Sequence, residues 1–279
     1  MKYYLMIIRP FNCLFIGLAV LAGGLLNNYM VDFTAMIFAI LSAIFIAAGG
    51  YVINDFYDLH IDIVNKPQRI MPRGKIAPER AYLYSLFLFV LGFSLSFFTA
   101  NIWAIIIAII NSLLLYFYAK KLKRSVLVGN IVVSYTTAST FLFGAVVGNN
   151  VTNILPIFAY TLLYTLVREI VKDAEDKRGD ERLQVKTLAT IYGEQKAVLI
   201  SLIPAVILAG LLVIGYGMRL SSVISTQTSF WVVFLLYTIP LLLIYVNLFR
   251  NITSSKLNES STLIKLHMLV LLFVLIFIG

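Results

Sequence analysis

The chain alternates long apolar runs with short polar segments. Crossing a bilayer takes an apolar helix of about 20 residues, and nine runs approach that length. They lie at residues 11–27, 33–53, 81–99, 102–118, 126–147, 151–170, 197–217, 229–248 and 262–278. Only residues 99–101 separate the third run from the fourth, so eight spans are the alternative. The pattern predicts an all-α, polytopic membrane protein with about nine transmembrane helices.

The composition favours a membrane protein without a separate soluble domain. Hydrophobic residues make up 61% of the 279 residues, and charged residues only 13%. Soluble domains carry about twice that share of charge. No polar stretch approaches the roughly 50 residues that a separate domain needs. We therefore expect residues 1–279 to form a single transmembrane domain.

The basic residues predict which side of the membrane each loop faces. Cytoplasmic loops retain Lys and Arg, whereas translocated loops lack them. With nine spans, all but Arg219 of the 22 Lys and Arg residues fall on the side of the amino terminus. We therefore expect a multi-pass protein of the cell membrane with a cytoplasmic amino terminus. The net charge of +9 suits anionic lipids or phosphorylated substrates, and nothing in the pattern indicates nucleic-acid binding.

Aspartates repeat with the same spacing at the ends of two spans. We call residues 54–62, NDFYDLHID, motif 1 and residues 168–180, REIVKDAEDKRGD, motif 2. The aspartates follow the spacing i, i+3, i+7 in both motifs, at positions 55, 58 and 62 and at 173, 176 and 180. On a continuous helix this spacing lines one face. A solvated helix end explains one such cluster, but it explains two with identical spacing poorly.

Stacked carboxylates repel one another unless a cation lies between them. Oxygen ligands without a His or Cys cluster favour Mg²⁺ or Mn²⁺, and Mg²⁺ often completes its coordination with water and phosphate oxygens. Basic residues accompany both motifs: Lys66 and Arg69 follow motif 1, Lys123 lies in the next loop, and Lys172 lies inside motif 2. Cations near a diphosphate stabilise the charge that develops as its ester bond breaks. The two motifs, if brought together, predict a magnesium site for a diphosphate substrate.

Aromatic residues near the same ends are candidates to line a cavity and to stabilise an allylic cation. They are Tyr51, Phe56, Tyr57, Tyr116, Tyr118, Tyr160 and Tyr164. No general base stands out. We interpret His60, which points away from the aspartate face, and His267 as solvated or hydrogen-bonded histidines.

At these residues the chain resembles the UbiA superfamily of intramembrane prenyltransferases. Motif 1 and the NKPQRIMPRG segment after it are similar to the family's NDxxDxxxD signature and its trailing segment. Motif 2, with the Lys-Thr pair at 186–187, resembles the second aspartate motif. RPFN at 9–12 and YAKKLKR at 118–124 match two less specific patches. The chain departs from the pattern at Ile70, where proline is commoner, and at Arg73, where a small residue is commoner.

The resemblance implies helices around a central cavity with a cytoplasmic cap, and two Mg²⁺ ions. One ion is expected at Asn54, Asp55, Asp58 and Asp62, and the other at Asp173, Asp176 and Asp180. The expected catalytic residues are Asp58, Asp62, Asp176 and Asp180. The expected substrate-binding residues are Arg9, Asn12, Lys66, Arg69, Tyr118, Lys123, Arg168 and Lys172.

Within the superfamily, motif 2 reads closest to that of the archaeal digeranylgeranylglyceryl phosphate synthases. The resemblance therefore implies transfer of a geranylgeranyl group from its diphosphate to geranylgeranylglyceryl phosphate in ether-lipid biosynthesis. The alternative is an aromatic acceptor, such as a quinone, haem or chlorophyll precursor. A cation-coupled transporter is a remote alternative, because transporter sites tend to lie near the membrane midplane. The absence of the DG-x-x-AR signature weighs strongly against a CDP-alcohol phosphatidyltransferase.

Overall fold

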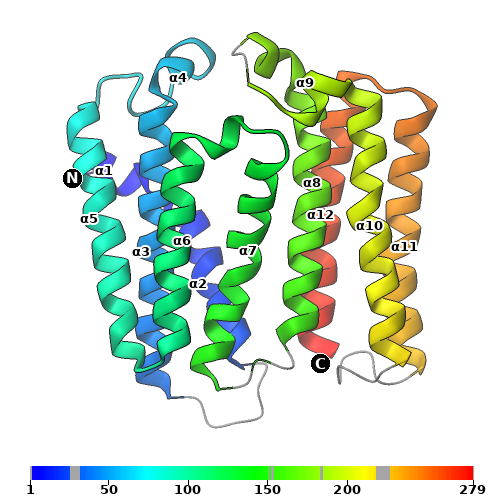
Figure 1. Ribbon diagram of the computed structural model, residues 1–279, viewed down its shortest axis with the longest axis horizontal. Helices are drawn as coiled ribbons and strands as arrows, with labels where there is room; N and C mark the ends of the chain where they lie inside the picture. Colours follow the sequence, from blue (N-terminus) through cyan, green and yellow to red (C-terminus); the bar gives the residue numbers. More distant parts are fainter. Residues whose placement is uncertain are drawn as a thin grey trace. The chain divides into compact units, whose positions relative to one another are not determined.

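The computed structural model describes residues 2–25, 32–149, 151, 154–182, 185–217 and 227–278. Over these residues the chain is helical and contains no strand. The α-helices (Figure 1) are α1 (Lys2–Ile7), α2 (Pro10–Leu25), α3 (Phe33–Tyr57), α4 (Leu59–Asn65), α5 (Pro78–Ser96), α6 (Ile102–Lys120), α7 (Val128–Val147), α8 (Leu155–Arg182), α9 (Leu188–Tyr192), α10 (Glu194–Gly217), α11 (Gln227–Arg250) and α12 (Ser254–Ile278). Two short 3₁₀ helices, η1 (Phe97–Thr99) and η2 (Leu122–Arg124), follow α5 and α6.

The helices confirm an all-α membrane protein with several spans. Among the described residues, six helices are long and apolar enough to cross a membrane: α3, α5 with η1, α6, α7, α10 and α11. The apolar helix α2 has 16 residues and is shorter than the length needed. The other two expected spans fall on α8 and α12. The total of nine spans therefore stays a prediction, as does the side on which Arg219 lies, because that residue is outside the described residues.

The chain divides into two compact units. Unit 1 comprises Met1–Lys123 and Ser139–Val151, and unit 2 comprises Arg124–Ala138 and Thr152–Gly279. Helix α7 contributes its first half to unit 2 and its second half to unit 1. Motif 1 lies in unit 1 and motif 2 in unit 2, so the expected meeting of the two motifs stays a prediction. The same holds for the single domain over residues 1–279 and for the central cavity with its cap.

Unit 1 is built around α3, which packs against α2, α5 and α6. Small residues let its helices approach closely, as is common in membranes. A Cβ atom added to Gly144 of α7 would lie 1.8 Å from the carbonyl oxygen of Val20 in α2. A Cβ atom added to Gly23 would lie 2.1 Å from the carbonyl oxygen of Phe141. These two helices therefore meet backbone to backbone.

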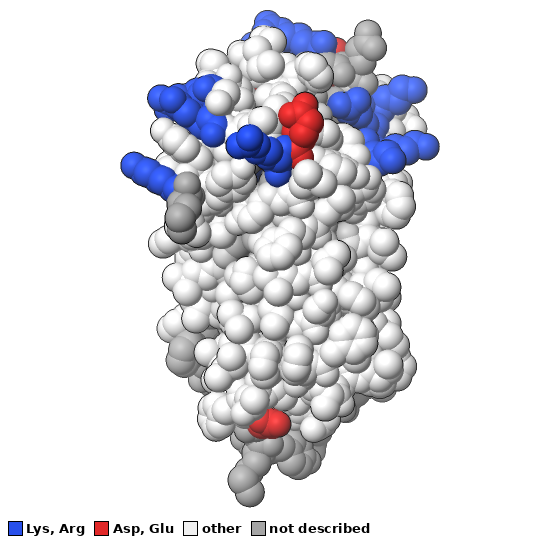
Figure 2. All heavy atoms as spheres, turned by 90° about the vertical axis from the view of Figure 1, so that its left-hand side faces the viewer, with Lys and Arg blue, Asp and Glu red and all other residues white. Residues whose placement is uncertain are grey.

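Charge in unit 1 collects at one end. Asp32 caps the amino terminus of α3 by accepting from the backbone N–H groups of Thr34 and Ala35, whereas motif 1 lies at the opposite end of that helix. The face in Figure 2 shows Lys and Arg side chains gathered at one end and uncharged residues over most of the remaining surface. This distribution agrees with the expected sorting of positive charge. The side of the membrane that this end faces stays a prediction.

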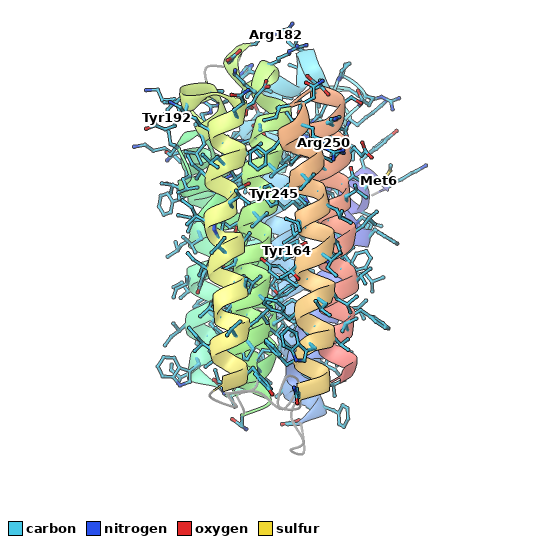
Figure 3. All side chains as sticks on the ribbon, turned by 90° about the vertical axis from the view of Figure 1, so that its right-hand side faces the viewer. Met6, Tyr164, Arg182, Tyr192, Tyr245 and Arg250 are labelled. Atoms are coloured by element: carbon cyan, nitrogen blue, oxygen red, sulfur yellow. The ribbon has the colours of Figure 1, made fainter. Side chains whose placement is uncertain are left out.

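Unit 2 packs α8 against α10 and α12, and α11 against α12. Tyr160 and Tyr164 are 2% and 0% exposed in its core. The Tyr160 hydroxyl donates to the carbonyl of Met268 at 3.3 Å, and the Tyr164 hydroxyl contacts His267 Nδ1. Figure 3 shows Tyr164 near the middle of the helices of unit 2, while Arg182 and Arg250 lie towards one end. The expectation that these two tyrosines line a substrate cavity is therefore wrong for this packing.

Two helices extend well beyond the expected spans. Helix α8 continues from the apolar run through Arg182, and α12 begins at Ser254, before the apolar run that predicted it. Hydropathy detects only the apolar part of such a helix, because the polar ends project into the headgroup region and water. His267 consequently lies inside α12, where its Nε2 donates to the carbonyl of Leu236 at 2.7 Å. It is a hydrogen-bonded histidine, as expected.

Candidate active site

Motif 1 lies where α3 gives way to α4. Asp55 is in the last turn of α3, Asp58 is the junction residue with φ −90° and ψ 0°, and Asp62 is in α4. The expectation of one uninterrupted helical face is therefore wrong here. The hydrogen-bond ladder nevertheless continues, because Asp58 N–H donates to Asn54 O at 3.0 Å and Asp62 N–H to Asp58 O at 2.8 Å. The three carboxylates thus stay on neighbouring turns despite the break.

Two arginines bind the outer aspartates of motif 1. Arg9 Nη2 lies 2.6 Å from Asp55 Oδ1. Arg69 Nη1 lies 2.6 Å from Asp62 Oδ2 and 3.4 Å from Asp55 Oδ1. Asp62 is only 3% exposed, so its charge is largely removed from water. One guanidinium therefore bridges two carboxylates that belong to different helices.

Lys123 binds the middle of motif 1 from the 3₁₀ helix η2, which follows α6. Its ammonium group forms an ion pair with Asp58 and lies 3.4 Å from Asn54 Oδ1. Asn54 Nδ2 in turn donates to Asp58 Oδ2 at 2.9 Å. Lys123 and Asp58 are 65 positions apart in the sequence, so their ion pair brings the end of α6 to motif 1. Each of the three aspartates consequently has a cationic partner.

The backbone around these cations is fixed by local structure. Arg9 separates α1 from α2 with φ 54°, a conformation that costs a non-glycine residue on the order of 1 kcal/mol. Its guanidinium lies 5.0 Å from the centre of the Tyr51 ring. The loop that carries Arg69 is held by Met71 and Ile76, which are 5% and 4% exposed. Both arginines are therefore positioned before any ligand binds.

Motif 2 lies on the continuous helix α8, so the helical spacing holds there. The innermost carboxylate accepts a hydrogen bond at 2.8 Å from Asn130 Nδ2 to Asp173 Oδ2. Asn130, in the first turn of α7, is 8% exposed. Glu169 stands one turn before Asp173 and extends the same acidic face. Sequence reasoning missed both residues. The four-residue spacing from Asp173 was a signal for Glu169, whereas nothing in the apolar context of Asn130 pointed to it.

Burial shifts the acidity of motif 2, whose aspartates lie beyond the expected end of the span at residue 170. It raises the pKa of Asp173 from 3.8 to about 7; the Asn130 hydrogen bond opposes this shift and the neighbouring carboxylates of Glu169, Asp180 and Asp176 add to it. Burial and the Asp176 charge raise the pKa of Asp180 to about 6, against the effect of Lys172. These carboxylates therefore hold protons more readily than exposed aspartates do.

The remaining expected substrate-binding residues differ in their surroundings. Lys172 Nζ lies 4.0 Å from Asp176 Oδ2 in an exposed i, i+4 pair, and Arg168 pairs with its neighbour Glu169. The Asn12 side chain interacts with that of Tyr51, whose ring lies 5.0 Å from the Arg9 guanidinium. Lys66 is exposed and Tyr118 is half-buried. The structure therefore brings Arg9, Arg69 and Lys123 into direct contact with motif 1. Within motif 2, Lys172 lies beside Asp176.

An aromatic cluster lies in unit 1 next to the end of α3. The hydroxyls of Tyr57 and Tyr82 each lie 3.4 Å from the hydroxyl of Tyr116. The Phe56 ring packs against both Tyr57 and Tyr82, with centroids 5.1 and 5.2 Å away. Of these residues, only Tyr82 was not among the expected aromatic candidates.

The donor atoms of both motifs suit a hard divalent cation. Asn54 and the three aspartates of motif 1 offer amide and carboxylate oxygens, the ligands that Mg²⁺ prefers. Within the described residues, no three His, Cys, Asp or Glu side chains converge in a geometry that would hold a metal ion. In motif 1 the Arg69 guanidinium contacts two of the carboxylates, and Arg9 and Lys123 each contact one.

Comparison with known proteins agrees with this chemistry. The sequence profile of the UbiA prenyltransferase family matches residues 13–274. This chain belongs to the UbiA prenyltransferase family. It is 39% identical over 216 residues to a digeranylgeranylglyceryl phosphate synthase of Methanopyrus kandleri, which covers 77% of this chain and 79% of the relative. It is 38% identical over 201 residues to the enzyme of that name from Saccharolobus solfataricus, covering 71% of each chain.

Solved structures show the same fold. A digeranylgeranylglyceryl phosphate synthase structure is 35% identical, has a TM-score of 0.83, and covers 99% of this UbiA chain and 97% of its own. A UbiA homolog from Archaeoglobus fulgidus, bound to GPP and Mg²⁺, has a TM-score of 0.73 over 98% of this chain and 99% of its own. At 18% identity, this second likeness concerns the fold alone. The chain is thus a polytopic prenyltransferase, as its sequence predicted.

Proposed function

We propose that this UbiA prenyltransferase transfers a geranylgeranyl group from geranylgeranyl diphosphate to geranylgeranylglyceryl phosphate, a step of archaeal ether-lipid biosynthesis. Relatives of that name at 38–39% identity cover more than two thirds of this chain, and a structure of that name matches nearly all of it. The observation that carries the proposal in the molecule itself is motif 1. There, three carboxylates and three cations stand together at the polar end of apolar helices.

The aspartates are proposed to hold Mg²⁺. Asn54, Asp55, Asp58 and Asp62 would hold one ion, and Asp173, Asp176 and Asp180 a second. The oxygen donors support this assignment, as does the shared fold with a relative bound to GPP and Mg²⁺. When bound, Mg²⁺ neutralises the charge that grows on the leaving diphosphate. Asp58, Asp62, Asp176 and Asp180 are then the catalytic residues of the proposal.

The basic residues of this chain are proposed to bind the diphosphate oxygens. Arg9, Arg69 and Lys123 stand among the motif 1 carboxylates, and Lys172 stands beside Asp176. Arginine presents a planar fork that fits phosphate oxygens, and lysine a compact charge. Asn12, Lys66, Tyr118 and Arg168 remain proposed substrate-binding residues.

The chemical step substitutes one oxygen for another at C1 of the prenyl group. The bond from C1 to the diphosphate oxygen breaks, and the glycerol hydroxyl oxygen of the acceptor forms the new bond. The hydroxyl proton passes to an aspartate carboxylate or to the departing diphosphate. The rings of Phe56, Tyr57, Tyr82 and Tyr116 provide faces that attract an allylic cation. Water must be kept out, because it would capture that cation.

The membrane supplies the setting for both substrates. Their prenyl chains would lie in the hydrocarbon, and their phosphates at the charged end of each unit. Positive charge at that end favours a cytoplasmic site in the cell membrane. No nucleic acid is involved in the proposed reaction.

The test uses purified protein in detergent with labelled geranylgeranyl diphosphate, with and without Mg²⁺. One reaction receives geranylgeranylglyceryl phosphate and a parallel one receives 4-hydroxybenzoate. We expect labelled product only with the glyceryl phosphate and only with Mg²⁺. Transfer to 4-hydroxybenzoate instead would replace the acceptor and keep the prenyltransferase. No Mg²⁺-dependent consumption of the diphosphate with either acceptor would contradict the proposal.

A further inference from the structure

The two aspartate motifs differ in how their charge is balanced. From this difference we infer that motif 1 takes up a divalent cation only together with a diphosphate, whereas motif 2 takes one up alone. The inference rests on the proposed function, because it assumes that both motifs bind Mg²⁺. It concerns the order in which the site is assembled.

Motif 1 is already neutral before any ligand binds. Asp55, Asp58 and Asp62 are paired with Arg9, Lys123 and Arg69 respectively. The side chains of the three aspartates are 13%, 19% and 5% exposed. A divalent cation that enters this cluster must separate buried ion pairs and leave cations without partners. Separating a buried pair is costly because the remaining charge is neither solvated nor paired.

A diphosphate removes that cost. Its oxygens accept hydrogen bonds from guanidinium and ammonium groups at least as well as carboxylates do. The arginines and the lysine can therefore turn from the aspartates to the diphosphate, and the freed carboxylates then coordinate the metal. Each arginine or lysine side chain thus exchanges a carboxylate partner for a phosphate partner and is not left unpaired. Metal and diphosphate consequently favour each other at motif 1, which is a positive coupling between two ligands.

Within the described part of unit 2, the aspartates of motif 2 lack this neutralisation. Among these described residues, the single cation within 4.0 Å of the three aspartates is Lys172, at 4.0 Å from Asp176. Both side chains of that pair are substantially exposed, at 44% and 54%, so the pair is weak. Asp173 has a neutral amide as its partner. The neighbouring Glu169 is paired with Arg168, which leaves no described cation for Asp173 itself. Among the described residues of unit 2, a divalent cation at motif 2 therefore relieves repulsion without displacing a buried cationic partner.

The coupling can be measured without catalysis. Full-length protein in detergent is titrated with Mn²⁺ at about pH 8, and free Mn²⁺ is followed by electron paramagnetic resonance. Methylenediphosphonate serves as a diphosphate that does not react. We expect one tight Mn²⁺ per chain without the diphosphonate and two with it. The second should bind at least about 10-fold more tightly when the diphosphonate is present.

Variants assign the coupled ion to motif 1. Arg69→Gln leaves this motif with an excess negative charge, so it should bind a second Mn²⁺ without the diphosphonate. Arg69→Lys keeps the charge, so it should still take up a single Mn²⁺ in the absence of the diphosphonate. Arg80→Gln removes an exposed cation from the first turn of α5 and should also leave the stoichiometry unchanged. Thermal denaturation checks that each variant is folded.

Two equally tight ions in the wild type without the diphosphonate would overturn the inference. So would an Arg69→Gln protein that is folded and still takes only one ion. Neither result would affect the proposed function if Mg²⁺-dependent transfer persists. In contrast, protein that binds no Mn²⁺ under either condition would refute the proposed metal site and the inference together.

Discussion

Asn130 Nδ2 donates a hydrogen bond to Asp173 Oδ2 at 2.8 Å, and so joins the first turn of α7 to the inner end of motif 2. The bond occupies one carboxylate oxygen and leaves the other for a ligand. Partners of this kind orient metal ligands, and their loss typically costs about 10–100-fold in affinity or activity. Asn130 is therefore a positioning residue for the proposed metal site.

Replacing Asn130 with leucine should weaken divalent-cation binding at motif 2. The apolar side chain fills similar space but leaves the buried Asp173 carboxylate without its donor. We expect the Mn²⁺ dissociation constant to rise about 10–100-fold and transfer to slow accordingly. Asn130→Asp should be worse, because it adds a second carboxylate beside the first. Ser134→Ala, one turn further along α7, is the control, because the Ser134 hydroxyl donates to the backbone carbonyl of Asn130 and not to the side chain that reaches Asp173. A comparable loss in that variant would contradict the assignment.

The raised pKa of Asp173, about 7, predicts a pH dependence of stability without metal. The folded carboxyl keeps its proton to higher pH than the unfolded one, whose pKa is near 3.8. Its contribution to stability is therefore complete below the unfolded pKa and is lost as pH rises through about 7. We expect Tm in EDTA to fall between about pH 5.5 and 8. Mg²⁺ should raise Tm more at the upper value, since below pH 7 it must displace a proton.

Asp173→Asn is the control for this titration. The asparagine cannot ionise, so the fall of Tm between those pH values should shrink, as should the pH dependence of stabilisation by Mg²⁺. The raised pKa of Asp180 leaves some dependence in place. An unchanged pH profile in Asp173→Asn would show that another group is responsible.

Lys123→Met should slow transfer strongly. The substitution removes the ion pair to Asp58 and a proposed diphosphate contact, and it leaves a largely buried carboxylate uncompensated. We expect kcat/KM for the diphosphate to fall on the order of 100-fold, which corresponds to about 3 kcal/mol. Steady-state kinetics would measure the loss, with Arg80→Met as a control for positive charge at the same end of unit 1. Wild-type kcat/KM in Lys123→Met would remove this residue from the site.

Gly144→Ala should destabilise unit 1. Its Cβ atom would lie 1.8 Å from the Val20 carbonyl oxygen, so α2 and α7 must move apart. Overpacking of this kind costs about 1–3 kcal/mol. Gly210→Ala is the matched control, because its Cβ atom would have no neighbour within 4 Å and alanine favours a helix by up to about 1 kcal/mol. Thermal denaturation should show a lower Tm for the first variant only; equal Tm values would contradict the close helix crossing.

Much of the fold could be read from the sequence, because a bilayer demands long apolar helices. The two aspartate motifs could be found from their repeated spacing, and Arg69 and Lys123 from their charge in the adjoining loops. Helix α12 begins earlier than predicted because its first turns are polar. The break of α3 at Asp58 has no proline or glycine to announce it. Asn130 could not be found either, since its contact depends on how α7 docks on α8.

Other residues show where position along a span misleads. Tyr160 and Tyr164 were expected to line a cavity because they lie near the polar end of a span, but they pack in the core of unit 2 instead. Both contact α12: the Tyr160 hydroxyl donates to the carbonyl of Met268, and the Tyr164 hydroxyl contacts His267 Nδ1. Whether such a side chain lines a cavity or packs in a core depends on which helix lies against it, and the local sequence does not indicate that helix.

The central claim is that both aspartate motifs serve one Mg²⁺-dependent transfer. The most direct test measures the rate of labelled geranylgeranyl transfer to geranylgeranylglyceryl phosphate in Asp62→Asn, Asp176→Asn and the double variant, with Tm as a check of folding. We predict that each single variant loses at least about 100-fold in rate and that the double variant is little slower, because residues acting as a unit are not additive. A folded Asp176→Asn protein that transfers at the wild-type rate would contradict the account.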